Sequence, residues 1–327
     1  MKQHYTRVTA FAPATVANVA SGFDVLGFAL ESPGDEVTAR LVAGEGVRIV
    51  SIVSDEGLPE LNLPTNPLEN TASGAVLALM RSLSDNSSEQ LLGKYGIELE
   101  IRKRMPAGSG MGSSAASAAA AVLAVNALVG NPKTPEELVE YGMKGEAIAS
   151  GSEHADNVAP AIMGGIVLIR GYNPLDVVRI PAPQNLYCTI LRPHCEVSTK
   201  EARGILPKEI PMKTAITQWG NLAGLIAGLM KQDMGLISRS LTDVVAEPFR
   251  AALIPGFHAM KAAALRVGAL GCSISGSGPS VFALSSSKAD AERVGAAMQE
   301  ALAKECVGGT LYVSQVAEGG PRIVSAE

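Results

Sequence analysis

The segment Pro106–Ala116 joins a glycine-rich turn to the start of an alanine-rich stretch, and it could bind phosphate groups. Its three alternating glycines permit positive φ angles and carry no Cβ atoms, so successive backbone N–H groups can close on an anion. Ser113 and Ser114 place hydroxyl groups at the start of the following helix, whose N-terminus carries a partial positive charge. We interpret this segment as a phosphate-binding loop.

Two better-known phosphate-binding motifs do not fit this segment. A Walker loop ends in Gly-Lys-Ser or Gly-Lys-Thr, and no lysine lies between Met105 and Asn131. A dinucleotide-binding fingerprint follows a buried apolar strand, whereas the preceding run, residues 97–104, alternates apolar and charged residues as a half-exposed strand does. An ordinary serine-capped turn between a strand and a helix stays open as the structural alternative.

Further along the chain, single polar residues are candidates for a metal or substrate site. Glu146 lies in a helix predicted over residues 134–150, beside Gly145 and Ala147 rather than among charged residues. A carboxylate on a helix more often faces solvent, so that alternative stays open. His154 has no second histidine or cysteine at metal-ligand spacing, which argues against a zinc site.

Asn18 and Asp24 stand six residues apart in a segment rich in small residues. Both side chains could therefore point into one cleft. The structural alternative is a pair of residues that stabilise turns through their own side chains.

Three motifs in this chain resemble those of the GHMP kinase superfamily, which includes the galactokinases, the homoserine kinases and the mevalonate kinases. The motifs occupy residues 12–27, 106–116 and 271–282. Their sequences are most similar to those of the homoserine kinase branch. The same holds for residues 146–165, 196–203 and 247–256. These stretches are spread over the whole chain.

The resemblance implies ATP and Mg²⁺ as cofactors. In the superfamily, the serine matching Ser114 and the glutamate matching Glu146 bind Mg²⁺. The residues expected to bind ATP are Pro106, Ala107, Gly108, Ser109, Gly110, Met111, Gly112, Ser113, Ser114, Ala115 and Ala116.

The resemblance also implies a binding site for an amino acid. Arg203 and Arg250 match segments that bind the carboxylate of homoserine, and a planar guanidinium can donate two parallel hydrogen bonds to a carboxylate. A surface position is the usual alternative for an arginine. The residues expected to bind the substrate are Asn18, Asp24, His154, Asn157, Thr199, Arg203, Arg250, Gly276 and Gly278.

One position departs from a related branch. Mevalonate kinases carry a catalytic aspartate eleven residues after the Mg²⁺ glutamate, and Asn157 stands there in this chain. We therefore expect the substrate hydroxyl to lose its proton late, without a dedicated side-chain base, because a loose transition state needs little activation of the nucleophile. Asp24, His154 and Asp156 stay open as rival bases. The expected catalytic residues are Ser114, Glu146 and Asn157.

The resemblance predicts ATP-dependent phosphorylation of the L-homoserine side-chain hydroxyl, giving O-phospho-L-homoserine for threonine biosynthesis. One alternative is a GHMP kinase for another small alcohol, such as shikimate or mevalonate. The other is a GHMP-fold protein that has lost catalysis and acts as a ligand sensor. The family also suggests a homodimer.

Length and composition narrow the class of protein. A chain of 327 residues favours two domains, predicted as residues 1–180 and 181–327. The net charge of −5, without runs of basic residues, argues against nucleic acid or an anionic membrane as a partner. The sequence has no signal peptide and no long apolar span, so we expect a cytoplasmic protein. Four irregularly spaced cysteines argue against a disulfide framework.

Hydrophobic periodicity and turn residues predict the elements that must position these side chains. In the first half, strands are expected over 7–13, 35–43, 47–53, 97–104, 164–172 and 177–180, and helices over 70–83, 113–129 and 134–150. We expect the second and third of these strands to form a hairpin around Gly44-Glu-Gly46.

In the second half, the expected order of elements is a βαββαβ unit with extra helices. Strands are expected over 186–192, 272–275, 280–285 and 310–316, and helices over 212–231, 234–243, 256–267 and 289–306. This mixture predicts an α+β fold. The resemblance implies the two-domain GHMP kinase fold, with an N-terminal half like domain 2 of ribosomal protein S5 and a ferredoxin-like C-terminal half.

Overall fold

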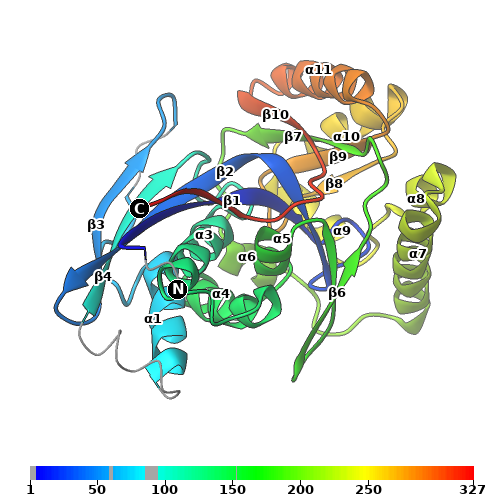
Figure 1. Cartoon of the computed structure of the whole chain (residues 1–327). Helices are drawn as coiled ribbons and strands as arrows, with labels where there is room; N and C mark the ends of the chain where they lie inside the picture. Colours follow the sequence, from blue (N-terminus) through cyan, green and yellow to red (C-terminus); the bar gives the residue numbers. More distant parts are fainter. Residues whose placement is uncertain (1–4, 59–61, 85–94, 152) are drawn as a thin grey trace.

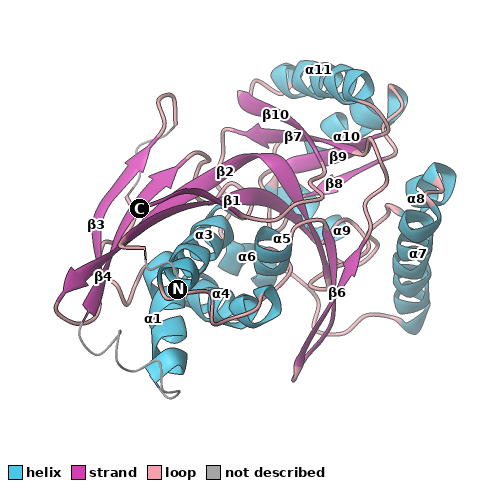
Figure 2. Ribbon diagram, viewed as in Figure 1, coloured by secondary structure: helices cyan, strands magenta, loops and turns pink. Residues whose placement is uncertain are grey.

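The structure is a computed structural model, and it describes residues 5–58, 62–84, 95–151 and 153–327. Two β-sheets lie side by side, and helices pack against each of them (Figure 1). A pair of helices stands apart at one edge of the molecule, and strands and helices are interleaved along the chain (Figure 2). The predicted α+β class is confirmed.

Seven strands form the first sheet: β1 (Arg7–Ala17), β2 (Leu26–Ala43), β3 (Val47–Ser54), β4 (Tyr95–Lys103), β5 (Ile166–Tyr172), β6 (Leu175–Ile180) and β11 (Arg322–Ala326). Their main order is β11-β1-β2-β4-β3, while β5 pairs with both β2 and β6. β2 is long enough to serve two partners on one side, because its start pairs with β5 and its end pairs with β4.

The predicted hairpin of residues 35–53 is wrong. β2 and β3 follow each other along the chain, but β4 lies between them and pairs antiparallel with β2 and parallel with β3. The turn at Gly44 and Gly46 is present, yet Gly46 accepts a hydrogen bond from Ile97 of β4. Local alternation identifies a strand but does not determine which strand becomes its neighbour.

Four helices pack together beneath the first sheet: α1 (Thr71–Ser84), α3 (Ser113–Leu128), α4 (Pro135–Ser150) and α5 (Val158–Met163). α3 lies against β1 and β2 and is buried almost all round, which its small alanine side chains make possible. The predicted start of α4 is confirmed, because Thr134 and Glu137 form a capping box there.

Four strands form the second sheet: β7 (Tyr187–Pro193), β8 (Gly271–Ile274), β9 (Val281–Ser285) and β10 (Gly309–Gln315). Their order is β10-β7-β9-β8, and neighbouring strands are antiparallel. The helices that pack on this sheet are α10 (Phe257–Arg266) and α11 (Lys288–Lys304). This order is that of a ferredoxin-like βαββαβ unit, so the prediction for the second half is confirmed.

Four further helices are inserted between β7 and β8: α6 (Thr199–Gly204), α7 (Met212–Lys231), α8 (Met234–Ser240) and α9 (Glu247–Arg250). α7 and α8 pair with each other and form the separate helices in Figure 2. α8 ends three residues earlier than expected. Asp243, expected inside α8, instead accepts backbone hydrogen bonds from the residues that begin α9.

The last strand, β11, was not expected and lies in the first sheet, where it pairs antiparallel with β1. The predicted second domain, residues 181–327, therefore ends on the sheet of the predicted first domain. For the residues other than β11, a domain boundary after residue 180 stays a prediction.

One large hydrophobic cluster extends from the first sheet into the second. At the junction, the rings of Phe28 in β2 and Phe282 in β9 meet edge to face, with centroids 6.2 Å apart. A smaller cluster lies between the second sheet, α10 and α11. The shared core holds the two sheets, and hence the loops at their ends, in one arrangement.

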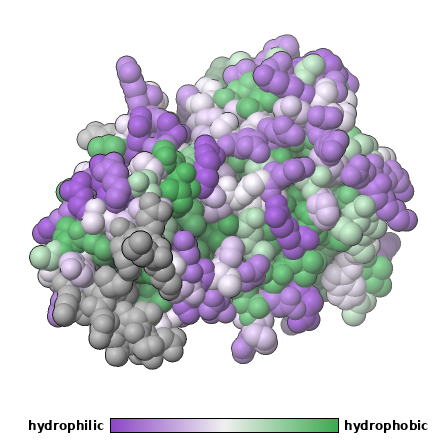
Figure 3. Space-filling model, viewed as in Figure 1, coloured by the Kyte–Doolittle hydropathy of each residue, from purple (hydrophilic) through white to green (hydrophobic). Residues whose placement is uncertain are grey.

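Hydrophilic side chains cover both halves of the face shown in Figure 3, and hydrophobic side chains form patches between them. Within the residues that the structure describes, no helix is long and apolar enough to cross a membrane.

Candidate active site

A single pocket of about 290 Å³ brings together residues from the first sheet, its helices and the loops of the second half. Of the residues expected to bind ATP, seven line it: Ala107, Gly108, Ser109, Gly110, Gly112, Ser113 and Ser114. Of those expected to bind substrate, all but Gly278 line it: Asn18, Asp24, His154, Asn157, Thr199, Arg203, Arg250 and Gly276. Glu146 lines it too. Residues predicted from separate motifs therefore share one cavity.

The remaining predicted residues do not line the pocket but lie in or next to the segments that do. Met111, Ala115 and Ala116 are fully buried, Pro106 is buried beside them, and Gly278 lies in the turn between β8 and β9. These five positions shape the loop or its neighbour, but they do not line the cavity.

The phosphate loop is held against the turn between β8 and β9. Gly110 has a φ of 77°, and a Cβ atom there would lie 2.7 Å from the Ser275 carbonyl oxygen and 2.8 Å from that of Gly278. The Ser275 hydroxyl donates a 2.6 Å hydrogen bond to the Gly110 carbonyl. Glycine is required at position 110 because the second half of the protein packs directly onto the loop.

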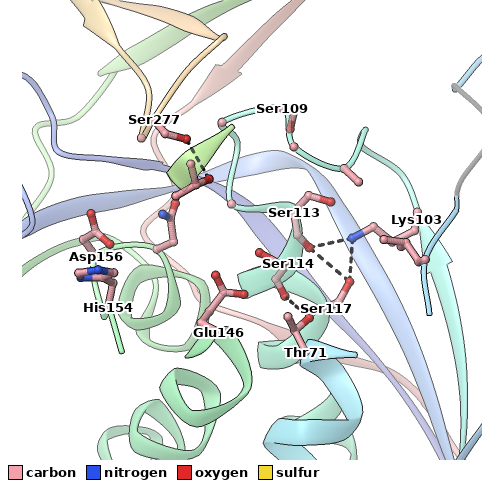
Figure 4. A pocket seen from close by; sticks show the side chains of 18 of the residues that line it. Thr71, Lys103, Ser109, Ser113, Ser114, Ser117, Glu146, His154, Asp156 and Ser277 are labelled. Carbon is pink, nitrogen blue, oxygen red and sulfur yellow. Dashed lines mark hydrogen bonds between the residues drawn. The ribbon is translucent and has the colours of Figure 1, made fainter. Parts of the chain in front are cut away.

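A buried lysine supports the start of α3. The Lys103 ammonium group donates to the Ser113 carbonyl at 2.8 Å and to the Ser117 hydroxyl at 2.8 Å (Figure 4). It also donates to the Asp35 carboxylate. Asp35 is fully buried and also accepts from the backbone N–H of Arg104 at 3.0 Å and from Ser117. This network fixes the helix N-terminus that faces the pocket.

The sequence contained a signal for Lys103 that we missed. Ile97, Leu99 and Ile101 are the inward residues of β4, and Lys103 continues the same alternation. A cation at the next inward position of a strand must be buried and paired. Its partner, Asp35, comes from a strand predicted separately and could not be named.

Ser114 and Glu146 face each other at the middle of the pocket (Figure 4). Burial raises the pKa of Glu146, while a hydrogen bond with the Ser114 side chain and the charge of Lys103 oppose that rise. A hydroxyl and a carboxylate are oxygen donors that suit a hard cation. The described residues contain no group of three or more His, Cys, Asp or Glu side chains that could hold a metal. Two protein oxygens next to a loop suited to phosphate groups fit Mg²⁺, which usually has few protein ligands.

At another end of the pocket, Asp24 and Arg203 form a bidentate ion pair. The Nη1 and Nη2 atoms of Arg203 each donate to the carboxylate at 3.0 Å, and this hydrogen bonding raises the pKa of Arg203. The Phe23 ring centroid lies 5.8 Å from the Arg203 guanidinium and 5.0 Å from that of Arg250. The pair is open to solvent on one side.

Arg250 is buried, not a surface residue. Its side chain donates 3.0 Å hydrogen bonds to the carbonyl oxygens of Ala202 and Gly276, and burial lowers its pKa. Asp243, which sequence reasoning did not single out, accepts from the backbone at the start of α9 and from Gln218 at 3.1 Å. These bonds place Arg250 at the edge of the pocket.

Asn18 combines the two roles considered for it. It lines the pocket, but its side chain also accepts from the backbone N–H of Asp24 at 3.0 Å and donates to Gly276 at 2.8 Å. The backbone is left-handed from Asn18 through Ala20 and again at Asp24. Non-glycine residues adopt such φ angles at a cost that the surrounding contacts must offset.

The loop before α5 carries three more polar residues of the pocket. His154 and Asp156 both line the pocket (Figure 4). Burial lowers the pKa of His154, and burial together with the charge of Asp24 raises the pKa of Asp156 to about 7. Asn157 accepts a 2.7 Å hydrogen bond from the Thr15 hydroxyl. Across the pocket, the hydroxyls of Thr199 and Ser277 are 3.3 Å apart.

Comparison with known families agrees with this arrangement. Residues 70–165 match the model for the GHMP kinases N terminal domain, and residues 225–304 match that for GHMP kinases C terminal. A homoserine kinase of Chlorobium phaeobacteroides (strain BS1) is 53% identical over 323 residues, which are 97% of this chain and 99% of that one. A homoserine kinase of Chloroherpeton thalassium is 53% identical over 91% of this chain and 93% of its own length.

Solved structures give the same result for the fold. The crystal structure of homoserine kinase from Cytophaga hutchinsonii is 51% identical, with a TM-score of 0.91 and 99% of each chain covered. The crystal structure of L. major mevalonate kinase in complex with R-mevalonate is 16% identical, with a TM-score of 0.69, covering 97% of this chain and 99% of that one. At that identity the likeness extends to the fold alone.

Proposed function

This chain belongs to the homoserine kinases of the GHMP kinase superfamily and phosphorylates the side-chain hydroxyl of L-homoserine with ATP, and we propose a role in this reaction for each group of residues in its pocket. The reaction gives O-phospho-L-homoserine and is a step of threonine biosynthesis. The observation that carries the proposal is the shared pocket, in which Ser114 and Glu146 lie in one cavity with Arg203 and Asp24.

The phosphate loop binds the ATP phosphates in this proposal. Its backbone N–H groups and the N-terminus of α3 provide the positive field, and Lys103 fixes the start of α3 through its hydrogen bond to the Ser113 carbonyl. Ser114 and Glu146 hold Mg²⁺, which when bound neutralises charge on the transferring phosphoryl group. Because burial disfavours the Glu146 carboxylate, a cation beside it lowers the free energy of the charged form.

The two charged ends of the amino acid are bound in this proposal by Asp24, Arg203 and Arg250. In the structure Asp24 and Arg203 pair with each other through two hydrogen bonds. A zwitterion can replace this pair without leaving either charge unpaired, since its ammonium group takes Asp24 and its carboxylate takes Arg203. Arg250, held by two carbonyl oxygens, adds positive charge on the carboxylate side.

No side chain acts as a dedicated base in this proposal. Asp24 is engaged with cations, and His154 and Asp156 orient the loop that carries Asn157. The substrate hydroxyl is held in line with the γ-phosphate and loses its proton late, as a loose transition state permits. Asn157 contacts the reacting groups as a neutral amide.

A substrate comparison tests the assignment. We expect Mg-ATP to be consumed with L-homoserine far faster than with D-homoserine, mevalonate or shikimate, as measured by coupled release of ADP. Equal turnover with mevalonate or shikimate would favour another GHMP kinase activity. Binding of L-homoserine without turnover would favour a ligand sensor instead.

We also propose that the enzyme acts in the cytoplasm as a homodimer, as the family resemblance suggests. Sedimentation equilibrium on the purified chain measures the oligomeric state. A mass of 33.7 kDa at all concentrations would contradict the dimer.

A further inference from the structure

Thr15 connects two parts of the active site that belong to different segments of the chain. It lies in β1 and is fully buried. Its backbone N–H donates to the carbonyl of Met111 in the phosphate loop at 3.0 Å. Its hydroxyl donates to Oδ1 of Asn157 at 2.7 Å. One residue therefore contacts both the loop that faces ATP and the amide that faces the substrate.

Asn157 uses its side chain in an unusual way for its position. It is the N-cap of α5, where asparagine normally accepts a hydrogen bond from the backbone of its own helix. Its side chain makes no such capping bond and accepts from Thr15 instead. The amide is thus turned away from its helix, in a residue that lines the pocket.

Gly112 packs closely against this hydrogen bond. Its φ is 66°, and a Cβ atom there would lie 1.9 Å from the Thr15 hydroxyl oxygen and 2.9 Å from Oδ1 of Asn157. The phosphate loop packs directly onto the bond between the two side chains. A shift of either group toward the loop would have to displace it. Which end of the amide lies against Thr15 is determined by the hydrogen bond from the Thr15 hydroxyl to Oδ1.

We infer that Thr15 is a positioning residue that fixes the orientation of the Asn157 amide. An amide group has one acceptor, its oxygen, and one donor group, its NH₂. Since the Thr15 hydroxyl occupies the oxygen, the NH₂ group is the part of Asn157 that faces the pocket. Asn157 therefore donates to an oxygen of the reacting groups and cannot accept the proton of the substrate hydroxyl. This inference rests on the proposed role of Asn157 at the reacting groups.

The first test removes the hydroxyl of Thr15. We expect Thr15→Val to lower kcat about 10- to 100-fold, because misplacing a group that contacts the reacting atoms has effects of this size. The KM values for homoserine and ATP should change less than about threefold. Thr15→Ser keeps the hydroxyl and should keep kcat. Thr15→Ala leaves more room beside Gly112 and serves as the second variant if valine disturbs the packing.

Thr9 provides the matched control. It lies in the same strand, and its hydroxyl bonds to that of Thr38 at 2.8 Å, away from the pocket. Thr9→Val should leave kcat unchanged. An equal loss of kcat in both threonine variants would show a general effect on β1 and would overturn the inference.

A double-mutant cycle separates this inference from the proposed role of Asn157. If Thr15 acts through Asn157, Thr15→Ala should have little further effect in an Asn157→Ala background. Loss of kcat in Asn157→Ala with wild-type kcat in Thr15→Val and Thr15→Ala would overturn the inference alone. Wild-type kcat in Asn157→Ala would overturn both the proposed role and the inference. In each case the wild-type enzyme's turnover of homoserine tests the assigned activity separately.

Asn157→Asp tests the orientation itself. The carboxylate can still accept from Thr15, but it presents a negatively charged oxygen to the pocket where the amide presents N–H groups. We expect kcat at pH 8 to fall at least as far as in Asn157→Ala, and to recover in part as the pH is lowered and the carboxyl group is protonated. Wild-type or higher kcat at pH 8 would show that an acceptor works at this position, and would overturn the inference.

Discussion

Two ion pairs in the pocket differ in their access to solvent. The side chains of Lys103 and Asp35 are 2% and 0% exposed, whereas those of Arg203 and Asp24 are 41% and 26% exposed. The buried pair is surrounded by further hydrogen bonds from Ser117 and the backbone. The open pair is held by its two mutual hydrogen bonds on a surface that a ligand can reach.

Because of this difference in solvent access, we expect the two ion pairs to have different roles. Breaking a buried pair leaves an uncompensated charge, so the Lys103 pair cannot exchange its partners and serves to fix the phosphate loop. An open pair contributes little to stability, because water and other charges can replace either partner. The Asp24 pair can therefore exchange its partners for the two charges of an amino acid.

The largest expected effect follows from breaking the buried pair. Lys103→Met and Asp35→Asn should each lower the free energy of unfolding by about 3 to 5 kcal/mol. The double variant should lose less than the sum, since neither charge is then left alone. Urea unfolding measures all three.

Asp24→Asn is the matched control on the open pair, and it should change the free energy of unfolding by at most about 1 kcal/mol. Equal losses for Asp24→Asn and Asp35→Asn would remove the distinction between the two pairs.

The next effect concerns Glu146, whose carboxylate is influenced by the charge of Lys103. Glu146→Gln and Ser114→Ala should lower kcat about 10²- to 10³-fold, the usual result of removing a contact made in the transition state. Glu146→Gln should not lower stability, because burial already disfavours the charged form. Steady-state kinetics at saturating Mg²⁺ and thermal unfolding measure the two quantities. Wild-type kcat in both variants would show that this pair of oxygens does not hold the metal.

A smaller effect is expected on the substrate side. Arg203→Leu and Arg250→Leu should raise the KM for homoserine roughly tenfold or more, since a charge-assisted hydrogen bond contributes about 1.5 to 3 kcal/mol. The KM for ATP should stay nearly unchanged. Arg48→Leu removes an exposed arginine of β3, paired with Glu98 of β4, and should alter neither KM. An unchanged homoserine KM in both pocket variants would exclude these arginines from the substrate site.

The last expected effect is a pH dependence of stability near the open pair. Burial and the charge of Asp24 raise the pKa of Asp156 from 3.8 to about 7. Between these values the unfolded chain is ionised at this position while the folded protein keeps the proton, so stability falls as the pH rises through this window and levels off above pH 7.

Asp156→Asn removes this dependence. Its stability relative to wild type should therefore increase by up to about 1.4 kcal/mol per pH unit from pH 4 to 7 and then remain constant. Chemical unfolding at several pH values measures the difference. A constant difference across the range would show that Asp156 is ionised throughout.

Local sequence signals predicted the longer helices and most strands, because caps, glycines and periodicity act within a few residues. The short helices α5, α6 and α9 were not predicted. Thr134 and Glu137 at the start of α4 are an example. The ferredoxin-like order followed from the sequence of elements in the second half. The hairpin of β2 and β3 failed because strand pairing is decided by the whole sheet and not by the turn.

The site was predictable where a motif or a resemblance marks it, and not where distant residues meet. The phosphate-loop residues and Arg203, which line the pocket, were predicted from their own segments. Lys103 with Asp35, and Thr15 with Asn157, are contacts over 68 and 142 residues. Neither contact leaves a local pattern that names its partner, so the structure was needed to find them.

The pairing of β11 with β1 also has a consequence for synthesis. Phe11 pairs with Arg322, more than 300 residues later in the chain, and the Arg322 guanidinium lies 4.0 Å from the Phe11 ring centroid. At typical translation rates, roughly 15 to 60 s pass between the synthesis of β1 and that of β11, its outer neighbour in the sheet. During that time the strand is an open edge, which can pair with other chains. The nascent protein therefore exposes this edge of β1 while its second half is being translated.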